Sequence, residues 1–83
     1  MVNKSASKIV KEIQKLHTEE EIRDFLLGVL TPGEVEEIAQ RIEIVKMLKK
    51  GVNQHEIAEK LGVGVATVTR GSKELKLGRF KSI

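Results

Sequence analysis

The chain contains no cysteine among its 83 residues. Without cysteine it can form neither a disulfide framework nor a thiolate metal site. The two histidines, His17 and His55, are expected on different helices and do not form a pair at metal-ligand spacing. The sequence therefore predicts no metal centre, and the cytoplasm is the expected location.

Long hydrophobic runs are also missing. Uninterrupted apolar stretches, such as residues 26–27 and 65–66, contain four residues or fewer, whereas a helix needs about 20 to cross a bilayer. Residues 1–10 lack the apolar stretch of a secretory signal. We therefore expect neither membrane insertion nor export.

The composition that remains is that of one small domain. The residues are 40% hydrophobic and 33% charged, and proline occurs once. A chain of this length buries only about 60–65% of the surface that its unfolded form exposes, so one modest core is expected. The sequence predicts a single domain over residues 1–83.

Basic residues are concentrated at the two ends of the chain, although the net charge is only +3. Residues 65–83 contain five basic side chains against Glu74 alone, which gives this segment a net charge of +4. A localised basic segment is typical of a protein that binds a polyanion, but solvated lysine-rich tails have the same composition. Charge alone leaves both interpretations open.

Every strong local pattern is helical, and no segment alternates like a strand. Ser5 or Ser7 can cap a first helix whose apolar residues recur at helical spacing up to Leu16. Thr18 and Glu21 form a capping box, in which each side chain satisfies an unpaired backbone N–H of the other. The helix that follows has an apolar face of five residues: Ile22, Phe25, Leu26, Val29 and Leu30.

A second capping box marks the start of a long helix. Thr31 and Glu34 supply the reciprocal caps, and Pro32 suits the first helical turn. Apolar residues recur up to about Lys50, and Gly51 is the expected left-handed stop. Because these helices carry more apolar surface than a small monomer can cover, we expect residues 1–50 to form dimerisation helices, although another protein could cover the same faces.

Residues 53–76 have the pattern of a helix-turn-helix. Asn53 and Glu56 form a third capping box, and Gly62 can adopt the positive φ that the turn requires. Ala58 is small where the two helices cross. Apolar residues anchor both helices: Ile57, Leu61, Val63 and Val68. A generic αα-hairpin is the alternative, because alanine and glycine are common at tight turns.

The second helix of this pair favours DNA binding over a generic hairpin. Its outward residues are small, hydroxylated or basic: Ala66, Thr67, Thr69, Arg70 and Lys73. Such side chains suit a major groove about 12 Å wide, whereas an ordinary surface helix would carry more glutamate. Residues 77–83 show no periodicity, so a frayed basic tail is expected there.

The run LTPGEVEEIAQRIEIVKMLKKG, followed by EIAEKLGVGVATVTRGSKELK, resembles the Trp repressor family over residues 30–76. The segment ATVTRGSKELK is much more specific than a general helix-turn-helix pattern. The capping boxes and the periodicity predict about five helices. The resemblance implies an all-α fold paired as an intertwined homodimer, and a transcriptional repressor that binds double-stranded operator DNA. Because the best-known member uses tryptophan as corepressor, L-tryptophan or a similar amino acid is an expected ligand.

Carried onto this sequence, the resemblance implies an indole site between Arg41 and Arg70, whose guanidinium planes can stack on an aromatic ring. Arg70 and Thr31 would bind the ligand's carboxylate. The other implied residues are Leu30, Thr67, Glu74 and Gly71, the last of which would allow close backbone approach. Arg41 also has a simpler interpretation, as an exposed residue paired with Glu37 one turn earlier.

The sequence departs from the family pattern in features that bear on ligand binding. Gly28 stands where the repressor has a large apolar residue, and Glu74 stands where it has a small hydroxyl residue near the ligand's amino group. Glu74 could pair with that amino group, or it could be a solvated charge that excludes the ligand. We expect no counterpart to the family's final helix after the recognition helix. A ligand-independent DNA-binding protein is therefore the alternative.

The motif and the resemblance agree that base edges would be contacted by Val65, Ala66 and Thr69. Residues expected near phosphates or the groove rim are Gln54, His55, Arg70 and Lys73. Val65 and Ala66 suit thymine methyl groups, and few side chains are long enough for bidentate base contacts, so water-mediated or shape readout is expected. His55 could also be an ordinary exposed helix residue.

Catalysis has little support in the sequence. No glycine-rich phosphate loop follows a strand, and Ser72 has no partner base nearby. The glutamates at 19–21 suit the dipole at the start of a helix. We therefore expect no enzyme. The alternative class is a helical protein-interaction module that does not bind DNA.

Overall fold

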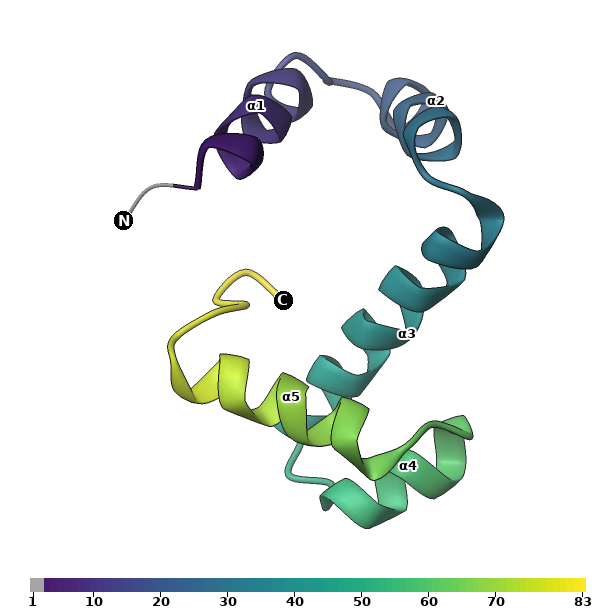
Figure 1. Cartoon of the computed structure of the whole chain (residues 1–83), viewed down its shortest axis with the longest axis vertical. Helices are drawn as coiled ribbons and strands as arrows, with labels where there is room; N and C mark the ends of the chain where they lie inside the picture. The colour runs from purple at the N-terminus through teal and green to yellow at the C-terminus, as the bar shows by residue number, and fades with distance from the viewer. Residues whose placement is uncertain (1–2) are drawn as a thin grey trace. The chain divides into compact units, whose positions relative to one another are not determined.

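The computed structural model describes residues 3–83, which form α-helices, turns and loops and contain no strand (Figure 1). The five helices of this part of the chain are α1 (Lys4–Ile13), α2 (Glu19–Val29), α3 (Pro32–Lys49), α4 (Gln54–Leu61) and α5 (Val65–Lys76). The all-α class and the expected number of helices are confirmed. Met1 and Val2, which begin the predicted dimerisation segment 1–50, lie outside the described residues. None of the described helices is both long and apolar enough to span a membrane.

The chain divides into two compact units, residues 1–35 and residues 36–83. The first unit contains α1, α2 and the first turn of α3. The second unit contains the rest of α3 together with α4 and α5. The boundary between the units therefore falls inside α3.

The first helix begins earlier than the sequence predicted. Asn3 is its N-cap, because Asn3 Oδ1 accepts a hydrogen bond from the backbone N–H of Ala6 at 3.0 Å. An N-cap needs a non-helical backbone, and Asn3 is extended whereas Ser5 and Ser7 already lie inside the helix. The prediction of a serine cap was therefore wrong. The helix also ends at Ile13, before Leu16.

Both capping boxes predicted in the first unit are present. Thr18 Oγ1 accepts from Glu21 N at 3.1 Å, and Glu21 Oε1 accepts from Thr18 N at 3.1 Å. At the start of α3, Thr31 Oγ1 accepts from Glu34 N at 3.2 Å, and Glu34 Oε1 accepts from Thr31 N at 2.9 Å. The backbone N–H of Thr31 is the main reason why the pKa of Glu34 lies below its ordinary value.

The second unit contains the buried core. Ile44 of α3, Ile57 of α4 and Val68 of α5 are at most 1% exposed and form one cluster with Ala58. Partly buried residues around the cluster include Leu61 and Val63. The apolar anchors predicted for the helix-turn-helix are therefore confirmed, and Ile44 ties that motif to the long helix.

The ends of α3 and α4 are set by glycines in the left-handed region. Gly51 has a φ of 85° and Gly62 a φ of 66°, as the turn predictions required. The predicted box at Asn53 is only half formed, because Asn53 Oδ1 accepts from Glu56 N at 2.9 Å while the Glu56 carboxylate faces Lys60 at 4.0 Å. Helix α4 then packs against α5, which supplies the tertiary support that so short a helix needs.

The residues after α5 turn back instead of fraying. Gly78 has a φ of 92° and Phe80 a φ of 62°, so the backbone reverses direction soon after the helix ends. Lys49 Nζ, at the end of α3, donates hydrogen bonds to the carbonyl oxygens of Phe80 and Ile83. The prediction of a frayed tail over residues 77–83 was wrong, because Gly78 permits the reversal and Lys49 supplies donors to the returning backbone.

Candidate functional site

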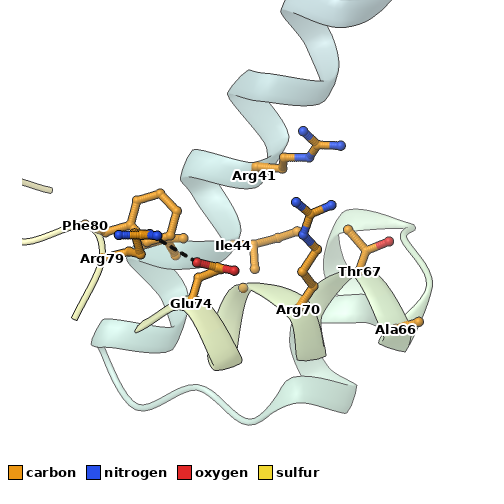
Figure 2. Close-up of a pocket in the computed structure, with 10 residues that line it drawn as sticks. Arg41, Ile44, Ala66, Thr67, Arg70, Glu74, Arg79 and Phe80 are labelled. Carbon is orange, nitrogen blue, oxygen red and sulfur yellow. Dashed lines mark ion pairs between the residues drawn. The ribbon is translucent and has the colours of Figure 1, made fainter. Parts of the chain in front are cut away.

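A hollow of about 510 Å³ lies between α3, α5 and the returning C-terminal segment of the second unit (Figure 2). Five of its lining residues were predicted as ligand contacts: Arg41, Thr67, Arg70, Gly71 and Glu74. The sequence assigned no ligand role to five others: Ile44, Val45, Ala66, Arg79 and Phe80. The structure thus brings five of the seven predicted ligand residues to one concave surface.

The remaining two predicted ligand residues, Leu30 and Thr31, belong to the first unit and do not line this hollow. Leu30 is the C-cap of α2, and its backbone N–H donates to Leu26 O at 3.0 Å. Thr31 caps α3, so its hydroxyl oxygen is already bonded to Glu34 N. Both residues therefore have a local role at the junction of two helices.

The two arginines predicted to hold the ligand come from different helices. Arg41 extends from α3 and Arg70 from α5, and their guanidinium groups enter the space between the two helices (Figure 2). Arg41 Nη2 also lies 3.9 Å from Glu37 Oε2, with more than half of each side chain exposed. An exposed ion pair of this kind contributes about 0–1 kcal/mol, so Glu37 holds the Arg41 guanidinium only weakly.

Glu74 has a partner that the sequence did not predict. Glu74 Oε2 lies 3.4 Å from Arg79 Nε, and this ion pair is the dashed contact in Figure 2. Phe80 lines the hollow beside it and is half-buried. Both Arg79 and Phe80 were missed because residues 77–83 were expected to fray. Gly78, which allows the backbone to reverse, was the one local signal that could have indicated them.

Gly71 was predicted to allow a ligand to approach the backbone closely. In the structure, Gly71 also allows a close approach between two helices of the protein itself. A Cβ atom at Gly71 would lie 3.3 Å from Ile44 Cγ2 and 3.6 Å from Leu48 Cδ1. Both neighbours belong to α3. The missing side chain therefore lets α5 approach α3 closely, on the wall of the hollow.

The residues predicted to contact DNA all lie on α4 and α5. Val65 and Ala66 are exposed in the first turn of α5, and the exposed polar or basic members are His55, Arg70 and Lys73. Gln54 and Thr69 are half-buried and joined by a short hydrogen bond, in which Thr69 Oγ1 donates to Gln54 Oε1 at 2.7 Å. Arg70 belongs both to this surface and to the hollow.

A metal site has no support in the described part of the chain. Within residues 3–83, no three histidine, aspartate or glutamate side chains are grouped so that they could hold a metal ion. The charged groups at the hollow are instead three arginines and Glu74. This arrangement suits an organic anion.

Comparison with known proteins gives consistent matches over nearly the whole chain. The family model described as Trp repressor protein matches residues 4–81. The Trp operon repressor homolog of Vibrio vulnificus (strain YJ016) is 46% identical over 70 residues, which cover 82% of this chain and 69% of that protein. No solved structure gave a significant match.

Similar relatives occur in other bacteria. The Trp operon repressor homolog of Vibrio cholerae serotype O1 is 44% identical over 69 residues, which cover 81% of this chain and 67% of that protein. The homolog of Chlamydia caviae is 46% identical over 63 residues, which cover 75% of this chain and 62% of that protein. These matches extend the similarity beyond the helix-turn-helix into the first unit.

Proposed function

Because the chain belongs to the Trp repressor family of regulators, we propose that it is a repressor that binds double-stranded operator DNA as a homodimer. Helices α4 and α5 make the DNA contacts. The hollow beside α5 takes L-tryptophan or a similar aromatic amino acid as corepressor. The single domain over residues 1–83 combines dimerisation helices in residues 1–50 with the DNA reader in residues 53–76.

The observation that carries the DNA-binding proposal is the pattern of burial along α5. Val68 is fully buried against the core, while Val65 and Ala66 on the same helix remain exposed. Apolar side chains of this size suit thymine methyl groups in the major groove. Arg70 and Lys73 then lie near phosphates, where they supply affinity that falls steeply with salt.

The homodimer is supported by the apolar surface of the first unit. Helices α1 and α2 contain no buried residue, and Ile13, Leu26 and Val29 are each at least 40% exposed. Amphipathic helices of about three turns are marginal in water unless their apolar faces are covered. A second copy of the chain covers these faces, as the family's intertwined fold implies.

The corepressor proposal rests on Arg41 and Arg70. Their guanidinium groups share a hollow whose volume of about 510 Å³ falls within the range typical of small-molecule sites. Because Arg70 also lies on the DNA-binding face, a ligand that orients Arg70 raises the affinity for DNA. By linkage, DNA raises the affinity for the ligand by the same factor.

Gel-shift titration with duplexes selected from a random library tests the DNA-binding proposal. We expect a shift that weakens with salt and is abolished by Thr69→Ala and by Arg70→Ala. Arg23→Ala, which removes a cation from α2, is the matched control and keeps the shift. Unchanged binding by both α5 variants would overturn the assignment of α5, and a folded wild-type protein that shifts no duplex at low salt would favour the protein-interaction module.

Calorimetry with L-tryptophan tests the corepressor. Wild-type protein gives saturable heat, and Arg41→Ala abolishes it because half of the guanidinium pair is lost. Circular dichroism of Arg41→Ala checks that the exposed substitution leaves the helices intact. No heat at millimolar tryptophan would favour a ligand-independent repressor.

A further inference from the structure

The segment that follows α5 forms one side of the hollow. We propose that Arg79 and Phe80 are ligand-site residues. Phe80 provides an aromatic contact surface, and Arg79 pairs with the Glu74 carboxylate, which a ligand's ammonium group would otherwise bind. The inference rests on the proposed corepressor function and refines its ligand class. The preferred ligand is an aromatic carboxylate whose α-ammonium group contributes little to affinity.

The segment is held in place by contacts at several points. Lys49 Nζ donates to the carbonyl oxygens of Phe80 and Ile83, and Arg79 pairs with Glu74 of α5 at 3.4 Å. Lys49 belongs to α3, the same helix that supplies Arg41. The wall that carries Phe80 is therefore tied to both helices that form the rest of the hollow.

Phe80 narrows the hollow without filling it. With its ring in place, the hollow still has a volume of about 510 Å³, which is ample for a small aromatic molecule. Aromatic rings attract one another in offset or edge-to-face arrangements. Phe80 therefore acts as a contact surface for a bound ring, and binding does not require the segment to leave.

The charges around the hollow favour a single negative charge on the ligand. The lining contains Arg41, Arg70 and Arg79 but only one acidic residue, Glu74, so it carries an excess of positive charge. Arg41 also lies 3.9 Å from Glu37, which is outside the lining. Arg79 is paired with Glu74, whereas Arg70 makes no ion pair within residues 3–83. A carboxylate thus finds an unpaired guanidinium, while an ammonium group must compete with Arg79 for Glu74.

Two ligands that differ only in the ammonium group test this inference. L-Tryptophan and indole-3-propionate share the ring and the carboxylate, and their own fluorescence reports binding because the protein has no tryptophan or tyrosine. We expect the wild-type protein to bind indole-3-propionate at least as tightly as tryptophan. Arg79→Gln frees Glu74, so tryptophan binding improves by about threefold to fivefold, the range of an exposed ion pair, while indole-3-propionate changes less than twofold.

The matched control is Lys81→Gln, which removes a cation from the same segment at a residue that does not line the hollow. It leaves both affinities unchanged. Phe80→Ala weakens both ligands by about threefold to tenfold, as expected for loss of an aromatic contact. If Phe80→Ala disturbs folding, the exposed Arg79→Gln substitution still gives the decisive comparison.

The outcomes separate the inference from the proposed function. If both ligands bind and Arg79→Gln changes their ratio no more than Lys81→Gln does, the inference is wrong and the corepressor site stands. If neither ligand binds to the wild-type protein, the corepressor proposal fails and the inference fails with it. Operator binding is measured without added ligand, so neither of these results decides the DNA-binding proposal.

Discussion

Thr69 and Gln54 were predicted as separate DNA contacts, and the structure joins them. Thr69 Oγ1 donates to Gln54 Oε1 at 2.7 Å, so the single hydroxyl proton of Thr69 is used inside the protein. The hydroxyl oxygen can then only accept a hydrogen bond from DNA. In the major groove, the groups that donate are the amino groups of adenine and cytosine.

Substitution of Gln54 tests whether this bond sets base preference. Gln54→Glu keeps an acceptor for Thr69, so the preference for adenine or cytosine at the contacted position persists while overall affinity falls through repulsion of phosphates. Gln54→Lys offers only donors, so the Thr69 hydroxyl becomes free to donate a hydrogen bond to guanine or thymine. We expect the preference to change by about threefold to tenfold, the range of one hydrogen bond.

The measurement is a binding titration with four duplexes that differ only at the contacted base pair. Because the added charges act on every duplex alike, only the ratio between duplexes reports the hydroxyl. An identical ratio in Gln54→Glu and Gln54→Lys would contradict the proposed orientation of Thr69.

The crossing of α5 over α3 depends on Gly71. A Cβ atom there would lie 3.3 Å from Ile44, which is 1% exposed and cannot move aside freely. Alanine in a helix gains about 1 kcal/mol over glycine, whereas overpacking a core costs about 1–3 kcal/mol. We expect Gly71→Ala to lower the free energy of unfolding by about 1 kcal/mol.

Gly28→Ala is the matched control for this substitution. Gly28 also lies in a helix, but a Cβ atom there would meet nothing within 4 Å. The gain in helix propensity is then unopposed, and the free energy of unfolding rises by about 0.5–1 kcal/mol. Urea denaturation followed by circular dichroism measures both variants, and equal stabilisation of the two would show that α5 does not need the glycine.

The start of α3 is expected to depend on pH through Glu34. Hydrogen bonds from Thr31 hold the pKa of Glu34 below its ordinary value of 4.5. The stabilisation by this cap is therefore complete above pH 4.5 and is lost as the pH falls through the lower pKa of the folded state. Glu34→Ala should lower helix content and the thermal midpoint at pH 7 and have a diminishing effect in acid.

Circular dichroism separates this effect from general acid unfolding. The wild-type protein, Glu34→Ala and Glu36→Ala are compared between about pH 2 and pH 7, a range that spans the titration of ordinary carboxyl groups. Glu36 lies in the same helix but outside the capping box. A difference between Glu34→Ala and wild type that stays constant over the whole pH range would contradict the role of the cap.

The features of the fold that local chemistry determines were predictable from the sequence. The boxes at Thr18 and Thr31 and the left-handed glycines at 51 and 62 are decided within a few residues, and all of them are present. The serine cap failed because several good capping residues lie close together near the N-terminus. Which of them caps the helix depends on the backbone that each adopts.

The hollow was only partly predictable, because its lining residues come from two kinds of segment. Arg41 and Arg70 lie in segments that the family resemblance covers. Arg79 and Phe80 reach the hollow through the bonds of Lys49 to the returning backbone, 31 positions apart in the case of Phe80. No periodicity or capping pattern reports a contact of that sequence separation, so a tail without periodicity was expected to fray.

In the isolated chain, the apolar faces of α1 and α2 are exposed. Ile22 is 44% exposed and Leu26 is 40% exposed, in a helix with no buried residue. A homodimer that covers these faces predicts a dimer mass by light scattering at micromolar concentration. Its thermal midpoint should rise with protein concentration, because association stabilises the folded state by mass action.

Leu26→Glu places a charge on the apolar face and should shift the protein to monomer with loss of helix content, because α1 and α2 lose the surface that covers them. Arg23→Glu adds the same side chain to the polar face of α2, where it disrupts only an exposed pair with Glu19 at 3.1 Å, and should remain dimeric. A wild-type monomer at micromolar concentration with a thermal midpoint independent of concentration would refute the homodimer. Such a monomer would have to expose these apolar faces to water, so another protein would then be needed to cover them.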